Sequence, residues 1–550
     1  MDNHIPETND AITEERPAKR PRVTEPTAEH VPIPMSTPQD AGDISEEEEE
    51  EIGWGRQSEA TKASDLYLDT INRAVLDFDF EKVCSVSLSN INIYGCLVCG
   101  KYFQGRGRNS YAYAHSIHDD HHVFINLETT KVYVLPDGYP VADPSLDDIA
   151  FVLSPTFTKN TVVDLSSPVH LSKPSFDLSS KPYIPGYIGL NDIKRNDYMN
   201  VIIHSLLHVA PLRDYLLLSN FRGKESELLK RFAGLAKKVW NPRLFKSQVS
   251  PHELLQEVGR ASGGKFSLEK QGDPVEFLTW LLHRLHKDVG GSKRKNSSKQ
   301  NPAARASLLK TTMIQASSMR HSKERFAWKP SKLSSALTST ETNLDSISTE
   351  DAIEKNIIPQ VSIQSVLSKY DGRATQESAG EVRRFKCSQL PQYVILHFKR
   401  FTKSNFVEEK NPTIVNFPLR GVDFRDCEDT CLSHLIRLSL ISRYPHSLGL
   451  PDLDAPPSNT QTVYDLIANV THESAAGTTR DKESTVWKVH LRAGSGGGEH
   501  EKWFQIQDLI VDEIRKEMIF LGETVLQIWE RRSPASPRSE TVPQKAASTV

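Results

Sequence analysis

Residues 189–217 read GLNDIKRNDYMNVIIHSLLHVAPLRDYLL, and this stretch decides the fold of the larger part of the chain. A second informative stretch, QGDPVEFLTWLLHRLH, covers residues 271–286. Its apolar side chains recur at the spacing of an amphipathic helix, at Val275, Phe277, Leu278, Leu281, Leu282 and Leu285. Further apolar segments follow as LPQYVILHFKRF (390–401), KNPTIVNFPL (410–419), YDLIANVTHE (464–473) and WFQIQDLIV (503–511).

Taken in order, these segments resemble the ubiquitin-specific protease family, which has a papain-like fold of thumb, palm and fingers. Residues 189–217 resemble the nucleophile box and residues 271–286 the second conserved box. The later segments resemble the central strands and the strands around the catalytic histidine and acid. The resemblance implies an α+β fold for residues 186–531, interrupted by a Ser/Lys/Asn-rich insertion at about 290–344 that we expect to be flexible.

The same resemblance indicates that the catalytic groups are missing. It places Asp197 where the family has its cysteine, and Val486 where it has its histidine. Gln507 stands at the position that orients this histidine, and Asp192 stands near an asparagine of the oxyanion hole. Acyl transfer needs a thiolate, a base and oxyanion donors. A carboxylate is a poor attacking group, and a second one repels the developing oxyanion. The sequence therefore predicts a protein that is not an enzyme.

A relocated active site is the alternative reading. Cys387, Cys427 and Cys431 are nucleophiles by residue type, and His397 and His472 are bases by residue type. Nothing in the sequence places any of them in the required mutual geometry. We therefore expect no substitute nucleophile.

A separate pattern upstream indicates a metal site. Cys96 and Cys99 form a C-x-x-C pair, and four histidines follow within about two dozen residues, at His115, His118, His121 and His122. Zinc takes four nitrogen or sulfur ligands in a tetrahedron. This spacing therefore predicts a structural zinc site.

Residues 64–160 resemble the ubiquitin-protease-type zinc finger, whose motif places the ligands at Cys96, Cys99, His115 and His121. Many relatives hold further zinc ions. Here Cys84 lacks a second C-x-x-C pair, and Gln104 stands where many relatives have a cysteine. We expect one zinc ion, in a small domain at 61–160 that is joined by a linker at 161–185. Some relatives bind the ubiquitin C-terminus with this finger, and Gly105–Gly107 keep part of that loop.

The two ends of the chain and its overall composition indicate the cellular compartment and limit the kinds of partner. Residues 1–60 are acidic and poor in large apolar side chains, so we expect disorder there and in the tail 532–550. Lys19–Arg22 form a basic cluster of the kind that serves nuclear import. The net charge of −4 gives no bulk attraction to RNA or membrane, so any RNA contact is local or indirect. Only six cysteines in 550 residues, four of them scattered, and the lack of a signal or spanning segment predict a reducing, intracellular compartment.

The finger, the run Lys194–Tyr198 and the segment YDLIANVTH together resemble one inactive, spliceosomal branch of the family. This resemblance implies a nuclear, non-catalytic scaffold in pre-mRNA splicing. Such a scaffold supports assembly and stability of the tri-snRNP and has snRNP proteins as partners. Two alternatives stay open: a reader that binds ubiquitin or a ubiquitin-like protein, and an active deubiquitinating cysteine hydrolase.

Overall fold

The computed structural model describes residues 63–165, 173–221, 226–288, 359–378, 381–387, 392–403, 408–425, 462–473, 486–494 and 501–532, together with 167, 171, 319–321 and 390. The expected tails at 1–60 and 532–550, apart from Arg532, and the cluster Lys19–Arg22 lie outside these residues. So does nearly all of the expected insertion at 290–344. Within that insertion the short strand β10 (Met319–His321) pairs with β13 (Glu381–Cys387).

The first module is built on a five-stranded antiparallel sheet with the order β2-β1-β3-β4-β5. Its strands are β1 (Ile93–Cys96), β2 (Tyr102–Gln104), β3 (Val123–Asn126), β4 (Val132–Val134) and β5 (Tyr139–Val141). The alternating sequence at 123–135 predicts the β3–β4 hairpin, and the register Phe124↔Tyr133 confirms it.

Short helices complete this module, namely η1 (Ala63–Thr70), η2 (Arg73–Val75), α2 (Tyr111–His118), η3 (Pro144–Leu146) and α3 (Asp147–Leu153). Ser110 caps α2 by accepting a hydrogen bond from the Tyr113 N–H, which satisfies one of the free donors of the first turn. Arg73 ties η2 to α3 through an ion pair of 2.6 Å with Asp148.

A group of helices follows: α4 (Lys159–Leu165), α6 (Asp197–Leu207), α7 (Ala210–Leu218), α8 (Glu227–Val239), α9 (His252–Ala261) and α10 (Pro274–Asp288). Every residue of α6 is buried. As the sequence predicts, α10 is amphipathic and buries Phe277, Leu278 and Leu281. Among the described helices, none alone is long and apolar enough to span a membrane, and the pair α6–α7 that passes together bends by 89°.

The segment expected as a linker, 161–185, contains regular structure. Helix α4 enters it, and the strands β6 (Ser175–Phe176) and β7 (Pro182–Tyr183) form a hairpin. Val162, Leu171 and Tyr183 bury their side chains in the core that surrounds α6. The segment is rich in Pro and Ser, but these three apolar side chains pack against residues that are distant in the sequence.

The largest sheet has the order β14-β23-β19-β20-β21-β22, and β18 (Val422–Asp423) also pairs with β19. All of its neighbours are antiparallel. The strands are β14 (Tyr393–His397), β19 (Val463–Glu473), β20 (Val486–Ala493), β21 (Lys502–Gln507), β22 (Ile510–Ile514) and β23 (Thr524–Arg531). The segments at 390–401, 464–473 and 503–511, which the resemblance assigns to strands, supply β14, β19 and β21–β22.

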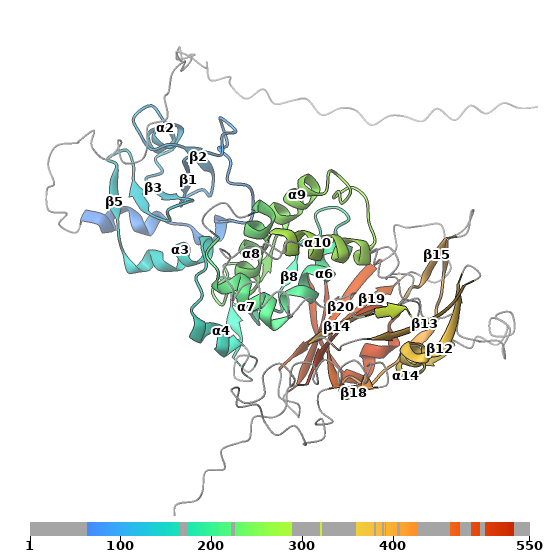
Figure 1. Cartoon of the computed structure of the whole chain (residues 1–550). Coiled ribbons are helices and arrows are strands. Elements are labelled where there is room, and N and C mark those ends of the chain that lie inside the picture. Colours follow the sequence, from blue (N-terminus) through green and yellow to red (C-terminus); the bar gives the residue numbers. More distant parts are fainter. Residues whose placement is uncertain are drawn as a thin grey trace, which may run out of the picture. The chain divides into compact units, whose positions relative to one another are not determined.

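The large sheet has one core on each face. Trp487, Val489 and Leu491 of β20 belong to the core that contains the side chains of α6. Figure 1 shows α6 and α7 beside this part of the sheet. Trp503 and Trp529 belong to the second core. That core also contains side chains of α14 (Ile363–Leu367) and η10 (Lys516–Leu521).

The remaining described elements are β8 (Gly189–Leu190), which pairs with β9 (Gln248–Val249), β11 (Gln360–Ser362), which pairs with β17 (Ile414–Asn416), η6 (Ser368–Tyr370), β12 (Asp371–Ser378), and β15 (Phe401–Lys403), which pairs with β16 (Glu408–Lys410).

The start of α6 meets the β21–β22 turn. The Leu190 N–H donates to the Asp508 carbonyl at 2.9 Å. A Cβ atom at Gly189 would lie 2.7 Å from the Leu509 Cα atom, so only glycine allows the two backbones to approach this closely. The fold thereby brings the residues before α6 together with the end of β21.

Candidate metal centre and carboxylate cluster

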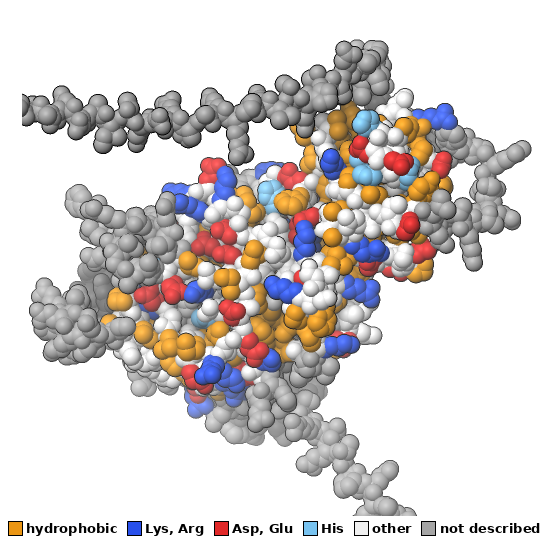
Figure 2. Space-filling view, turned by 180° about the vertical axis from the view of Figure 1, so that it is seen from behind, with side chains coloured by type: hydrophobic (Ala, Val, Ile, Leu, Met, Phe, Trp, Pro, Cys, Tyr) orange, Lys and Arg blue, Asp and Glu red, His pale blue; other side chains and the backbone are white. Residues whose placement is uncertain are grey.

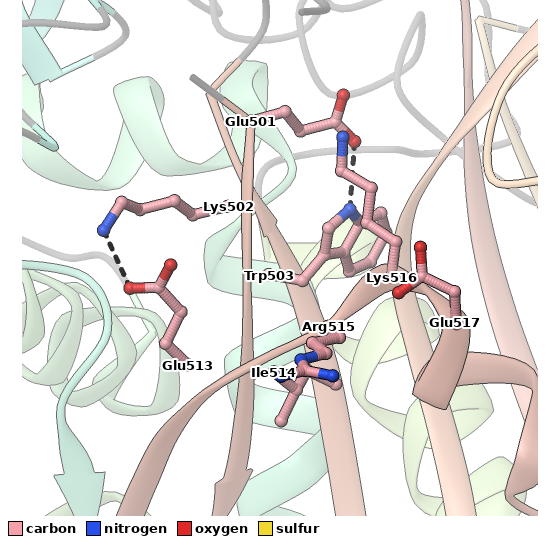
Figure 3. A pocket seen from close by; sticks show the side chains of 8 residues that line it. All are labelled: Glu501, Lys502, Trp503, Glu513, Ile514, Arg515, Lys516 and Glu517. Carbon is pink, nitrogen blue, oxygen red and sulfur yellow. Dashed lines mark hydrogen bonds and ion pairs between the residues drawn. The ribbon is translucent and has the colours of Figure 1, made fainter. Parts of the chain in front are cut away.

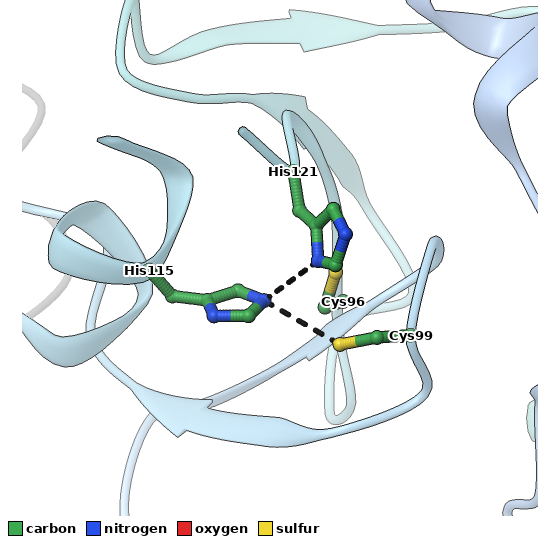
Figure 4. Close-up of side chains that lie close together, drawn as sticks. All are labelled: Cys96, Cys99, His115 and His121. Atoms are coloured by element: carbon green, nitrogen blue, oxygen red, sulfur yellow. Dashed lines mark hydrogen bonds between the residues drawn. The ribbon is translucent and has the colours of Figure 1, made fainter. Parts of the chain in front are cut away.

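The structure brings together Cys96, Cys99, His115 and His121, whose candidate ligand atoms all lie within 4.8 Å of one another (Figure 4). The His115 Nε2 atom is 3.4 Å from the Cys99 Sγ atom and 3.0 Å from the His121 Nδ1 atom. Tetrahedral zinc with its usual bond lengths separates neighbouring ligand atoms by about 3.3–3.8 Å. The cluster therefore fits zinc with small adjustments, using Nε2 of one histidine and Nδ1 of the other.

Local backbone geometry explains why these residues converge. Cys96 ends β1, and the chain turns back through Gly100, whose φ is 78°. The Gly100 N–H donates to the Cys96 carbonyl at 2.9 Å and closes the turn that carries Cys99. His115 lies on α2, and Asp120, with φ 57°, turns the chain so that His121 faces back toward it.

The other two histidines point to different partners. His118 is exposed and pairs with Asp119 at 2.8 Å. The His122 ring lies 2.7 Å from the Leu135 carbonyl and 2.9 Å from the Asp120 carboxylate. Asp119 also contacts the Nδ1 atom of His115 at 2.5 Å. A carboxylate on the far nitrogen of a metal-binding histidine fixes the ring orientation and its tautomer.

The thiols of Cys96 and Cys99 differ in pKa. The hydrogen bond with Cys96 lowers the pKa of Cys99, and the same contact raises the pKa of Cys96. The pair is thus poised to lose one proton first, and a bound zinc ion would remove the second.

Cys84 and Gln104, which the sequence analysis singled out, form a hydrogen-bonded group with Ser87. Cys84 is fully buried in the core of the module, and its Sγ atom accepts a hydrogen bond from the Ser87 N–H at 3.4 Å. The Ser87 hydroxyl donates to Gln104 Oε1 at 2.8 Å. Cys84, Ser87 and Gln104 hold this loop by hydrogen bonds and packing. Among the described residues the only metal-sized cluster is the tetrad.

Asp197, the first residue of α6, is buried and accepts several hydrogen bonds. The Gln271 Nε2 atom donates to both of its oxygens, at 2.9 and 2.8 Å. The Tyr198 N–H donates at 2.8 Å, and the Trp487 N–H at the start of β20 also donates. This carboxylate therefore links α6, the segment before α10 and the large sheet.

A polar network surrounds the carboxylate of Asp197. The Asn196 N–H donates to Asp192 at 3.0 Å, and the Asn196 side chain accepts from the Ile193 N–H at 2.7 Å. Asn200 donates to Asp508 at 3.1 Å. These bonds fix the loop before α6 and connect it to the β21–β22 turn.

Three carboxylates thus share one region. Burial is the main cause that raises the pKa of Asp197, and the nearby Asp192 adds to it. Burial likewise raises the pKa of Asp508 to about 6, with Asp192 and Asp197 contributing. In this region burial and neighbouring carboxylates disfavour negative charge, so it is unsuited to stabilise an oxyanion.

The remaining predicted positions fall around this cluster. Val486 opens β20 directly before Trp487, and Gln507 ends β21 directly before Asp508. Among the described residues, neither side chain forms a hydrogen bond with Asp197. Val486 has no group that could take a proton. The N–H groups of Asn196, Tyr198 and Trp487 are occupied by the chain's own carboxylates, so they are not free to serve an acyl-transfer step.

The candidate substitutes lie elsewhere in the fold. Cys427 and Cys431 are outside the described residues, and Cys387 ends β13. His397 lies on β14, where burial lowers its pKa to about 4. The His472 ring packs edge-on against Trp487, with ring centroids 4.6 Å apart. These contacts are those of structural side chains.

Sequence reasoning missed two members of the cluster. Gln271 opens the segment QGDPVEF, and Asp508 follows the predicted Gln507. Both lie inside the quoted segments, so their proximity to Asp197 could have been suspected. Their hydrogen bonds depend on tertiary contacts across 74 residues for Gln271 and 308 for Asn200 and Asp508.

The surface mixes charges of both signs. Figure 2 shows acidic and basic side chains interspersed over the visible described face, with hydrophobic side chains between them. This distribution agrees with the small net charge of −4. No extended basic surface is visible on that face.

Comparison with known proteins relates both modules to described families. Residues 188–539 match the family described as Ubiquitin carboxyl-terminal hydrolase. Residues 84–146 match the family described as Zn-finger in ubiquitin-hydrolases and other protein.

The similarity to individual proteins extends over most of the chain. It is 43% identical to "Probable mRNA-splicing protein ubp10" of Schizosaccharomyces pombe, over 90% of this chain and 93% of that protein. It is 41% identical to "Ubiquitin carboxyl-terminal hydrolase 39" of Homo sapiens, over 85% of this chain and 80% of that protein. A solved structure described as an essential yeast splicing factor superposes with a TM-score of 0.59 at 26% identity, covering 85% of this chain and all of that one.

Proposed function

The chain belongs to the ubiquitin carboxyl-terminal hydrolase family, and from this premise we propose that it acts in pre-mRNA splicing as a non-catalytic scaffold. One observation carries the proposal. The relative that is 43% identical over 90% of this chain is named a probable mRNA-splicing protein. Because this similarity includes both the finger and the large module, it supports a shared role more strongly than similarity in one module would.

The absence of catalysis is supported by the chemistry around Asp197. A buried carboxylate that accepts hydrogen bonds from Gln271, Tyr198 and Trp487 is held in place by the fold, and it is a poor attacking group for an amide. Val486, which stands at the position of the family's base, has no group that could take a proton. In this proposal Asp192, Asp197, Val486 and Gln507 occupy former catalytic positions and now hold the fold together.

The finger, proposed at residues 61–160, holds one structural zinc ion. The ligands are Cys96, Cys99, His115 and His121, which lie together at the ends of β1 and α2. When bound, the ion would link the β1 turn to the helix and the loop behind it. Its role is to stabilise the fold, because four protein ligands leave no position for a substrate.

The proposed place of action is the nucleus, and the proposed partners are spliceosomal snRNP proteins. The function within splicing is to support assembly and stability of the tri-snRNP. Contact with RNA is local or goes through these proteins, in keeping with the net charge of −4.

Purification of the tagged full-length chain tests the role in splicing. We expect tri-snRNP proteins and small nuclear RNAs to co-purify, and we expect depletion of the protein to reduce both the tri-snRNP and splicing in extract. Splicing that proceeds unchanged after complete depletion would contradict the proposal.

Hydrolysis of a fluorogenic ubiquitin substrate tests the absence of catalysis. We expect the full chain to release no fluorophore at a concentration at which an active deubiquitinating enzyme turns over completely. Turnover that is lost on replacing Cys387, Cys427 or Cys431 would establish the relocated active site instead.

A second candidate function is a reader of the ubiquitin C-terminus. The Arg106 guanidinium lies 4.5 Å from the centre of the Tyr133 ring, on the loop that some related fingers use for this purpose. Binding that depends on Arg106 and on the terminal Gly-Gly of ubiquitin would support this function. Titration with intact ubiquitin and with ubiquitin lacking those two residues distinguishes it from non-specific contact.

A further inference from the structure

Strand β22 forms an edge of the large sheet. Among the described strands it pairs with β21 alone and stands last in the sheet order. Ile510, Asp512 and Glu513 are exposed. An uncovered edge presents unpaired N–H and C=O groups to which a further strand can add.

The hairpin register tells which backbone groups are free. Gln507 and Ile510 are the last pair before the two-residue turn Asp508–Leu509, so a hydrogen bond from the Ile510 N–H to the Gln507 carbonyl closes it. Pairs alternate along an antiparallel ladder between bonded and non-bonded. The backbone groups of Val511 and Glu513 therefore point away from β21, toward the open side.

Exposed apolar side chains flank this edge along the chain. Leu509 and Ile510 at its start are 45% and 54% exposed, and Met518 and Leu521 in η10 are each 54% exposed. These side chains are apolar surface that a segment docked on the edge can bury.

The far end of β22 borders a hollow of about 410 Å³ between β21, β22 and η10 (Figure 3). Two of its acids have partners. Glu513 pairs with Lys502 at 2.7 Å, and Glu501 accepts from the Trp503 indole N–H at 2.9 Å and pairs with Arg420.

The cations of the hollow are less well matched. Within the described part of the chain, Arg515 and Lys516 form no ion pair, and both are exposed. Glu517, which also lines the hollow, forms no ion pair among the described residues either. The hollow therefore offers two cations against one free acid, which favours a carboxylate from outside.

A second copy of this chain is a poor occupant. Antiparallel pairing of two β22 edges through the free groups of Val511 and Glu513 would place Asp512 of one copy directly opposite Asp512 of the other. Like charges directly opposite each other destabilise a strand pair. The occupant must instead offer a neutral or basic residue at that point.

We propose that β22 is a docking edge for an extended segment of a partner protein, which adds to the sheet as a further strand. The segment carries a basic residue opposite Asp512 and an acidic residue that enters the hollow toward Arg515 and Lys516. Its source is a spliceosomal protein, and in this respect the inference rests on the proposed function.

Hydrogen exchange on the full-length chain, alone and in the purified snRNP assembly, measures the edge directly. We expect the Val511 and Glu513 amides to exchange at least about tenfold more slowly in the assembly, because strand addition pairs them. A photo-crosslinking residue at position 512 is expected to label one extended segment that contains both a basic and an acidic residue.

Charge reversal supplies a test that leaves the core untouched. Arg515→Glu with Lys516→Glu should weaken the assembly by about tenfold or more, since it turns attraction into repulsion. Lys173→Glu with Lys181→Glu is the matched control, because both residues are exposed and the charge change is the same. Val511→Pro removes a free N–H at the edge and should also weaken the assembly.

The outcomes separate the two proposals. If the assembly forms while residues 510–514 exchange unchanged and the charge reversal has no effect, the docking edge is wrong and the splicing role stands. If no snRNP component co-purifies with the wild-type chain, the splicing role fails and takes this inference with it. Protection that appears only with rising concentration of the pure protein would identify a second copy as the occupant and overturn the proposal.

Discussion

At the scale of single residues, Asp197 contributes more to structure than to chemistry. It accepts from Gln271, Tyr198 and Trp487, which come from three different parts of the fold. Burial raises its pKa, so the carboxylate costs desolvation energy that its hydrogen bonds offset. Its net contribution is the difference between these two effects.

Replacing Asp197 with alanine should lower the free energy of unfolding by about 1–3 kcal/mol, because buried donors lose their acceptor. Asp137→Ala, at an exposed loop position, is the control and should change it by no more than about 0.5 kcal/mol. Urea unfolding of both variants measures the difference. Equal stability of the Asp197 variant and the wild type would mean that the desolvation cost cancels the bonds.

Restoring the nucleophile alone should not restore hydrolysis. In Asp197→Cys, a thiol with an ordinary pKa of about 8.5 is only a few per cent ionised at neutral pH. Val486 cannot remove its proton, and Asp192 opposes the oxyanion, where one lost donor costs about 100- to 1000-fold in rate.

A fluorogenic ubiquitin substrate measures this directly. The combined variant Asp197→Cys, Val486→His, Gln507→Asp and Asp192→Asn is the comparison, since it supplies every group that the resemblance identifies as missing. Efficient turnover by Asp197→Cys alone would mean that another residue acts as the base.

At the scale of elements, we expect the fold of the finger to depend on a zinc ion held by the tetrad. Cys99→Ser should abolish zinc binding and expose the amides of β1, β3 and α2 to rapid exchange, because metal binding contributes to folding. Cys84→Ser is the matched control, since Cys84 lies with Ser87 and Gln104 away from the tetrad. Elemental analysis should give one zinc per chain for the wild type and for the control, and two would reveal a further site.

The elements that the sequence predicted well are those with a local signature. The amphipathic pattern at 271–286 indicates α10, and the alternation at 123–135 indicates the β3–β4 hairpin. Local patterns could not predict the structure at 161–185, where Leu171 and Tyr183 become ordered only by joining the core around α6. They also could not reveal the bond from Gln271 to Asp197, which joins residues 74 positions apart.

At the scale of the whole molecule, buried histidines should make the fold sensitive to acid. Burial lowers the pKa of His204 to about 3 and those of His208, His397 and His490 to about 4. Below pH about 6.5 the unfolded chain takes up protons that these folded side chains cannot accept. Stability is therefore fully present above that pH and falls as the pH is lowered.

Asp508 acts in the opposite direction. Its pKa of about 6 lies above the usual value, so below pH 6 the folded state gains a proton before the unfolded state does. The proton that folded Asp508 takes up offsets the stability loss caused by about one of these histidines. The net expectation is a loss of several kcal/mol between pH 7 and pH 5, at about 1.4 kcal/mol per pH unit for each uncompensated proton.

His204→Met isolates one of these groups. Both ring nitrogens of His204 are buried without a hydrogen-bond partner among the described residues, so an apolar side chain of similar volume fits the site. The variant should match or exceed the wild type at pH 7, and its stability should fall less steeply below pH 6.5, by about 1.4 kcal/mol per pH unit. Urea unfolding at several pH values gives the slope, and an unchanged slope would show that His204 takes up a proton in the folded state.

The hydrogen bonds around Asp197 also bear on descent. A mutation that returned a cysteine to this position would leave the Gln271 amide and the Trp487 N–H without their acceptor. It would yield no hydrolysis until three further positions had changed as well. The Asp197→Cys intermediate is then less stable than its parent and has no compensating activity, so selection disfavours it. If Asp197 replaced a catalytic cysteine, as we propose, the hydrogen bonds that it gained disfavour a stepwise reversal. A gradual return of this lineage to protease activity is then selected against.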